Sequence, residues 1–144
     1  MKIKYFEAVK KINEVVPVFV NRNCKRKVQA YYNIHKNEIH VPYNKKRKVY
    51  SFECLIHEFV HFLTIRCLPV TTPIKDGKTG ALFYEPYEVI AELVTMDVNQ
   101  VCNLKYTYQG YYMQKIGANK YKQYYKEYQE LIKDTVKVIM EIIK

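Results

Sequence analysis

Hydrophobic residues recur every three to four positions over residues 2–16, a spacing that predicts an amphipathic helix ending at Pro17. Tyrosines and β-branched residues dominate residues 28–42, on either side of a polar turn at 36–37. This pattern predicts two short antiparallel strands, the second of which is closed by Pro42. The first part of the chain is therefore expected to place one helix before a small sheet.

Helical spacing of hydrophobic residues continues through the rest of the chain. Ser51 is a suitable N-cap for a helix that runs to about Arg66, and Pro86 suits the first position of a helix that runs to about Val101. Between these helices, residues 69–83 contain prolines and glycines and are predicted to form a loop. Two further helices are predicted over residues 107–117 and 119–143.

These elements predict an α+β fold dominated by helices, with a small antiparallel sheet beside the helix that begins at Ser51. A length of 144 residues is typical of one domain, which we expect to span residues 1–144. Hydrophobic residues make up 49% of the chain, enough to exclude an intrinsically disordered protein. No run approaches the roughly 18 apolar residues of a membrane span, and early charges exclude a signal peptide. We therefore expect a cytoplasmic protein with free cysteines.

Charge narrows the class of partner only slightly. The formal net charge is +10, but 20 of the 24 basic residues are lysines, whereas nucleic-acid readers depend on arginine for bidentate contacts. The basic runs at 25–27 and 45–48 could contact nucleic acid, although such runs are more often solvated loops. Only four glycines are present, which excludes a glycine-rich phosphate loop. The four histidines are more informative than the total charge.

The sequence His-Glu-x-x-His occupies residues 57–61, inside the helix that begins at Ser51. His57 and His61 are four residues apart, so both imidazoles project from one face of the helix and can reach a single ion. Glu58 is offset by about 100° around the helix axis, where it can take a proton from a water that the metal activates. The helix is apolar nearly all round and should be buried, so these polar residues need partners.

Two histidines do not hold zinc alone, so a third ligand is required. Glu88 and Glu92 are four residues apart on an otherwise apolar predicted helix. We favour Glu88 as the ligand, because the helix N-terminus stabilises an ionised carboxylate, and expect Glu92 to accept the free N–H of a ligand histidine. The opposite assignment of the two glutamates stays open. Cys67 is a further candidate, but a small core residue is the simpler interpretation.

These motifs resemble those of the gluzincin branch of the zincin metallopeptidases. The similarity is closest to the zincin-like metallopeptidase domain of plasmid and phage antirestriction proteins, the ArdC family. It rests on residues 30–42, 57–61 and 84–93, and it covers roughly residues 28–143. It does not include the family's DNA-binding domain or the aromatic-Thr-Gly stretch usual after the second histidine. The resemblance implies a zincin-like fold and a zinc-dependent peptidase.

In that family the two histidines and a glutamate of the second motif bind the metal, which corresponds here to His57, His61 and Glu88, with Glu58 as general base. We therefore predict a zinc metallopeptidase that acts on a protein or peptide substrate and belongs to a mobile element. The alternative is a non-catalytic metal-binding module that binds protein or nucleic acid. Substrate and oligomeric state stay open. The candidate donors to the developing oxyanion are Tyr84, Tyr87, Tyr108 and Tyr111.

Overall fold

The computed structural model describes residues 4–22, 30–69, 73–75, 82–105 and 111–144. The helices are α1 (Tyr5–Asn13), α2 (Lys48–Thr64), α3 (Tyr87–Val101), α4 (Tyr111–Ile116), α5 (Ala118–Glu127) and α6 (Gln129–Ile143). The strands are β1 (Val18–Asn21), β2 (Tyr31–Asn33), β3 (Glu38–Pro42), β4 (Pro73–Lys75) and β5 (Leu82–Tyr84). This confirms the prediction of a helix-dominant α+β fold. None of the helices described is both long and apolar enough to cross a membrane.

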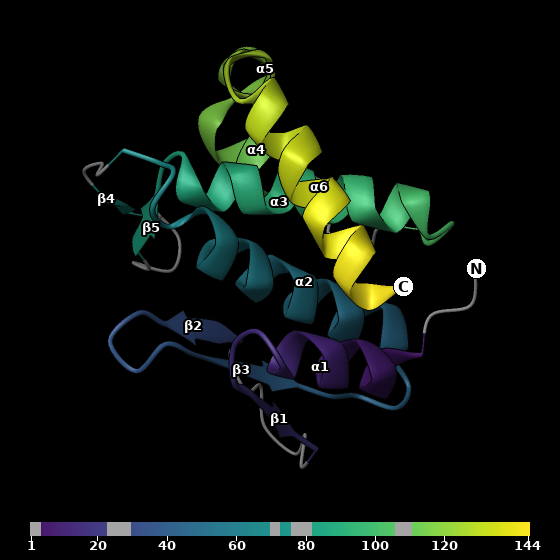
Figure 1. Cartoon of the computed structure of the whole chain (residues 1–144). Coiled ribbons are helices and arrows are strands. Elements are labelled where there is room, and N and C mark those ends of the chain that lie inside the picture. The colour runs from purple at the N-terminus through teal and green to yellow at the C-terminus, as the bar shows by residue number, and fades with distance from the viewer. Residues whose placement is uncertain (1–3, 23–29, 70–72, 76–81, 106–110) are drawn as a thin grey trace.

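Helix α2 lies between the three-stranded sheet and α3, as Figure 1 shows. Its side chains Leu55, Ile56, Phe59 and Val60 have no solvent exposure. A helix covered on two sides must be apolar over most of its circumference, and this explains the nearly continuous hydrophobic sequence of α2. The buried position that the sequence predicted for the His-Glu-x-x-His helix is confirmed.

Helix α3 forms the next layer, and α6 crosses over it (Figure 1). Ile90, Val94 and Val98 of α3 are fully buried, and Ile132 and Ile139 of α6 are buried in the same core. The three-to-four spacing of the buried residues of α6 leaves its opposite face polar, as expected of a helix that packs along one side. The C-terminal helices therefore cover the side of α3 that faces away from α2.

The three-stranded sheet is mixed, with the order β1-β3-β2. Strand β2 is antiparallel to β3, as predicted for the hairpin, whereas β1 is parallel to β3 with Val18 opposite Ile39. The expectation of a purely antiparallel sheet was therefore wrong. Strand β1 has only four residues directly after Pro17, too few for a periodic signal, and it is defined by its pairing with a strand far along the chain.

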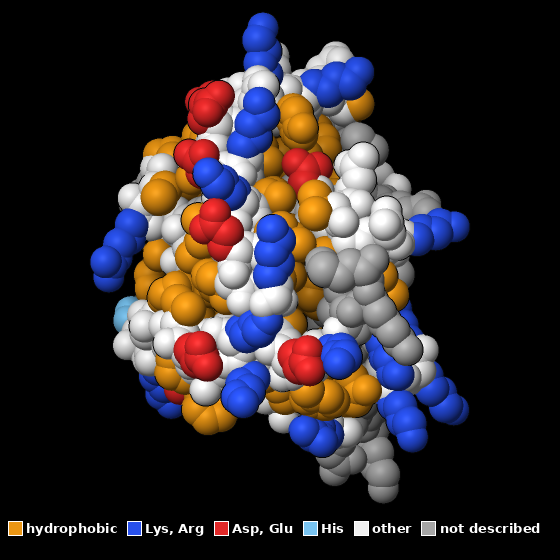
Figure 2. All heavy atoms as spheres, turned by 45° about the vertical axis from the view of Figure 1, so that its right-hand side comes forward, with side chains coloured by type: hydrophobic (Ala, Val, Ile, Leu, Met, Phe, Trp, Pro, Cys, Tyr) orange, Lys and Arg blue, Asp and Glu red, His pale blue; other side chains and the backbone are white. Residues whose placement is uncertain are grey.

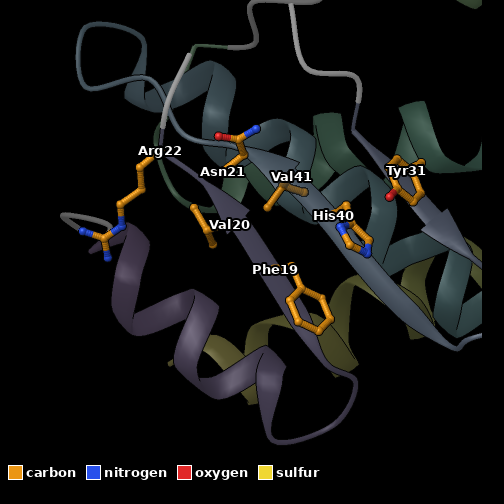
Figure 3. Close-up of a pocket in the computed structure, with 7 residues that line it drawn as sticks. All are labelled: Phe19, Val20, Asn21, Arg22, Tyr31, His40 and Val41. Atoms are coloured by element: carbon orange, nitrogen blue, oxygen red, sulfur yellow. The ribbon is translucent and has the colours of Figure 1, made fainter. Parts of the chain in front are cut away.

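The sheet carries a row of aromatic rings on its outer face. Phe19, His40 and Tyr31 lie side by side on the three strands, with ring centroids 4.9 and 4.6 Å apart across His40. They are among the residues that line a hollow of about 670 Å³. Figure 3 shows these side chains on the sheet. Because Ile39 and Val41 are buried and residues alternate along a strand, His40 points away from the core. His40 therefore lies on the face of the sheet opposite to the one that packs on α2.

Two predicted boundaries were wrong. Helix α2 begins at Lys48, so Ser51 lies within its first turn and is not the N-cap. The Ser51 hydroxyl instead donates to the backbone carbonyl of Arg47 and accepts a hydrogen bond from the backbone N–H of Asn44.

The region predicted as a loop over 69–83 contains β4 and β5, which pair antiparallel. Strands of three residues are too short to be recognised among prolines and glycines.

The single helix predicted over 119–143 is in fact two helices. Helix α5 ends at Glu127 and α6 begins at Gln129, with a change of direction between them that Figure 1 shows. Tyr128 has φ −102° and ψ 20°, outside the helical region, although its backbone N–H still donates to the carbonyl of Tyr124. No proline or glycine marks this position, so only the packing of the two helices against α3 explains the change.

The described cysteines are free, as predicted, but the burial of one of them differs from the prediction. Cys54 is half-buried, Cys102 is buried, and both are free. Cys67 is also free but exposed, so its assignment as a core residue was wrong. It lies in the turn that follows α2, beyond the part of that helix that the sheet and α3 cover. Cys24 lies outside the described residues.

The position of the core can be tested with two valines of α3. Val94 has no solvent exposure, whereas the Val101 side chain is 55% exposed. Val94→Ala removes two buried methyl groups and should lower the free energy of unfolding by about 2 kcal/mol, measured by urea denaturation. Val101→Ala makes the same chemical change at the surface and should cost less than about 0.5 kcal/mol. Equal losses would contradict the packing of α3 described above.

Candidate metal centre

Three side chains from two helices meet at the interface between α2 and α3. Nε2 of His57 lies 3.0 Å from Oε2 of Glu88, and Nε2 of His61 lies 3.1 Å from Oε1 of the same carboxylate. The two imidazoles project together because they are one helical turn apart on α2. Glu88 reaches them from the first turn of α3, which packs along α2. The structure thus brings together the three ligands that the sequence proposed.

The spacing of these atoms fits a small divalent cation. The three ligand atoms lie within 4.8 Å of one another. A tetrahedral ion with bonds of 2.0–2.1 Å separates its ligand atoms by about 3.3 Å, a few tenths of an ångström more than the two nitrogen–oxygen distances here. The side chains of His57, His61 and Glu88 keep 23%, 12% and 21% of their surface exposed, so solvent reaches the cluster. Because the two distances run to different oxygens of Glu88, the side chains must move to share one ion.

Without a cation, a proton occupies this cluster. Burial alone would lower the pKa of His61, but the charge and hydrogen bond of Glu88, together with Glu58, raise it to about 9. Burial would raise the pKa of Glu88, but the charge of His61 and the hydrogen bonds from His57 and His61 hold it well below its usual range. The metal-free site therefore contains an imidazolium and a carboxylate at neutral pH.

Glu58 lies next to this cluster but does not join it. Only 6% of its surface is exposed, and its buried Oε2 has no hydrogen-bond partner among the described residues. Burial raises the pKa of the Glu58 carboxyl; His57 and His61 oppose this change, and Glu88 adds to it. A buried carboxylate oxygen without a partner is costly, and such groups are usually found where a site needs them. Glu58 is thus a buried carboxyl beside the cluster, with a pKa above its usual value.

Tyr112 of α4 completes the site, and sequence reasoning missed it. Its phenol donates to Oε2 of Glu88 at 2.8 Å, and its ring lies 6.4 Å from that of His57 at an angle of 24°. Its backbone N–H donates to Oε2 of Glu92 at 3.0 Å. Glu92 is almost fully buried, and this contact links it to the cluster through Tyr112. The role predicted for Glu92, acceptance of a histidine N–H, stays a prediction.

Among the tyrosines that the sequence offered as oxyanion donors, Tyr87 has other partners, Tyr84 stays a prediction, and the rest are not described. The phenol of Tyr87 donates to the backbone carbonyls of Ile65 and Leu68, which ties the start of α3 to the end of α2. The Tyr84 side chain is 45% exposed. Tyr108 and the side chain of Tyr111 lie outside the described residues. The only signal for Tyr112 was its place in a tyrosine-rich segment, and that signal did not separate it from its neighbours.

The remaining candidate features lie apart from this site. In the described part of the chain, His57, His61 and Glu88 are the one group of metal-ligating side chains close enough to share an ion, and neither Cys54 nor Cys67 joins them. Residues 45–48 form an exposed basic segment that leads into the first residue of α2, and residues 25–27 are not described. On the face that Figure 2 shows, basic side chains alternate with acidic and hydrophobic ones.

Neither a family model, nor a curated protein, nor a solved structure matches the chain. The site is therefore defined by its own geometry.

Removal of any of the three ligands should abolish tight binding of a divalent cation. His57→Ala, His61→Ala and Glu88→Ala should each weaken Zn²⁺ binding by at least about 100-fold, because a ligand is worth more than the outer contacts whose loss costs 10- to 100-fold. The matched control is His35→Ala, which removes an exposed histidine outside the cluster. Competition with a chromophoric chelator measures the affinities, and equal affinity in all variants would contradict the site.

Cation binding should release a proton, because a histidine must be neutral to bind a metal. The pKa of His61 is raised to about 9 in the metal-free site, so at pH 7 the ion displaces the proton and about one proton per ion should leave. Apparent affinity should therefore rise with pH from 7 to 9. Calorimetric titration in buffers of different ionisation enthalpy counts the protons. If the His61→Ala variant released as many protons per ion as the natural chain, the assignment of the displaced proton to His61 would be contradicted.

Proposed function

We propose that the chain is a zinc-dependent metallopeptidase with a zincin-like fold, in which His57, His61 and Glu88 hold Zn²⁺ and Glu58 is the general base. The observation that carries this proposal is the buried carboxylate of Glu58 beside a group of three convergent ligands. One of its oxygens has no hydrogen-bond partner in the part of the chain that the structure describes. A site that only held a metal would have no need of this additional buried carboxylate.

The donor set supports Zn²⁺ as the ion. Two imidazole nitrogens and one carboxylate oxygen are the ligands of many catalytic zinc sites, and three protein ligands leave the fourth position for water or substrate. Zn²⁺ held there supplies Lewis acidity, which polarises the scissile carbonyl and lowers the pKa of a water molecule in the site. The partial exposure of His57 and Glu88 gives a substrate access to this position.

Glu58 performs the proton transfers in this proposal. Its raised pKa brings the carboxyl closer to the pH of a neutral solution, where a general base works best. It takes the proton of the attacking water and then delivers it to the leaving amine. The positive charge of a bound ion would lower the pKa of Glu58 again and keep the carboxylate ionised before the reaction. Because Glu58 follows His57 directly on α2, the same helix positions both the base and the ligands.

A protein or peptide substrate is favoured by the strand beside α2. Strand β2 is an edge strand of the sheet, and the ring of Tyr32 packs edge-on against Phe62 of α2, with centroids 5.9 Å apart. An edge strand presents unpaired backbone groups that an extended peptide can join. A segment bound in this way would run along the helix that carries His57 and His61.

Glu58→Gln is the decisive variant for the peptidase proposal. The amide keeps the size of the side chain but cannot accept the proton, so cleavage should fall by at least about 100-fold while Zn²⁺ affinity is retained. The matched control is Glu127→Gln on the exposed surface of α5, which should keep full activity. Cleavage is measured by mass spectrometry on a mixed library of synthetic peptides with the Zn²⁺-loaded chain.

Two results would contradict the proposal. Equal cleavage by the Glu58→Gln variant would exclude Glu58 as the base. Tight Zn²⁺ binding by the natural chain without cleavage of any peptide in the library would instead support the alternative, a non-catalytic metal-binding module.

A further inference from the structure

We infer that Tyr112 is a positioning residue for Glu88: from α4, its phenol holds the carboxylate in the orientation that faces His57 and His61. The inference rests on the proposed function, in which Glu88 is a ligand of Zn²⁺. Its basis is the hydrogen bond of 2.8 Å from the Tyr112 phenol to Oε2 of Glu88. Oε1 of the same carboxylate is the oxygen close to His61. Oε2 thus lies within hydrogen-bond distance of both the Tyr112 phenol and His57, while Oε1 faces His61.

Glu88 needs such a donor because its side chain is long and partly exposed. A glutamate side chain has three rotatable bonds, so fixing its carboxylate in one place costs conformational entropy. A carboxylate that is already fixed when the ion arrives adds no such cost to binding. Hydrogen bonds from outer groups to ligand carboxylates strengthen metal sites for this reason. The phenol of Tyr112 is in the position to perform this role for Glu88.

Tyr112 is itself held by the same helix that carries Glu88. Its backbone N–H donates to Oε2 of Glu92, which lies one turn further along α3. Its ring also lies at a small angle to that of His57, with centroids 6.4 Å apart. Glu88 and Glu92 therefore bind the side chain and the backbone of one residue of α4. In this arrangement Glu92 acts on the site through Tyr112.

The neighbouring helix α5 provides a matched control. The phenol of Tyr124 donates to Oε2 of Glu85 at 3.0 Å, and Lys120 pairs with the same oxygen at 2.7 Å. Like the bond from Tyr112 to Glu88, this bond joins a phenol of the C-terminal helices to a carboxylate in or just before α3. Glu85, however, is not one of the three clustered ligands. Tyr124→Phe therefore removes an equivalent hydroxyl without affecting Glu88.

The experiment compares Tyr112→Phe and Tyr124→Phe in the full chain. Zn²⁺ affinity is measured by competition with a chromophoric chelator, and Co²⁺ is added as a spectroscopic probe of the ligand geometry. Tyr112→Phe should bind Zn²⁺ about 10- to 100-fold more weakly and should change the visible absorption spectrum of bound Co²⁺. Tyr124→Phe should retain the affinity and the spectrum of the natural chain. Urea denaturation without metal establishes that both variants are folded.

A second pair of variants shows whether Tyr112 acts through Glu88. In a Glu88→Ala background, Tyr112→Phe should leave the residual affinity of the two histidines for Zn²⁺ unchanged. Unchanged affinity of the single Tyr112→Phe variant, or equal losses for Tyr112→Phe and Tyr124→Phe, would overturn the inference alone. Absence of any Zn²⁺ binding by the natural chain would overturn the proposed function together with it.

Discussion

The contact between α2 and α3 places a carboxylate against two imidazoles within a largely apolar interface. Charged groups are costly to bury unless each finds a partner, and here His57, His61 and Glu88 are partners of one another. The arrangement works only if the two helices keep their relative position, since a shift of one residue would turn Glu88 away from the histidines. The fully buried side chains of α2 and α3 fix that position. The hydrophobic core and the polar cluster therefore depend on the same packing.

The C-terminal helices contact carboxylates in α3 and directly before it. Glu85 accepts hydrogen bonds from α5, and Glu88 and Glu92 accept hydrogen bonds from Tyr112 of α4. Each of these carboxylates is mostly buried, so each needs its donor. Docking of α4 onto α3 thus stabilises the orientation of Glu88, which faces the histidines of α2. Helix α4 therefore belongs to the site together with the helix that carries the histidines.

The fold was predictable wherever a local pattern was long enough. The apolar sequence of α2 indicated a buried helix, and the tyrosine-rich residues around the turn at 36–37 indicated the β2–β3 hairpin; both are confirmed. The strand β1 was missed because four residues cannot show a period, and its pairing with β3 arises only when the chain folds back. The break at Tyr128 was missed because backbone hydrogen bonds continue across it and no residue there disfavours a helix.

The sequence by itself determined which residues could form a metal site, because spacing along a helix fixes which side chains share a face. His57 and His61 had to project together, and Glu58 had to stand beside them. Glu88 and Glu92 share a face of α3 in the same way, so spacing alone did not separate them. Only the tertiary structure decided between them: the depth at which α3 meets α2 brings Glu88 to the histidines and leaves Glu92 one turn away, bound to Tyr112. Contacts between segments that are far apart in the sequence depend on tertiary packing, and the spacing of residues within one helix does not specify that packing.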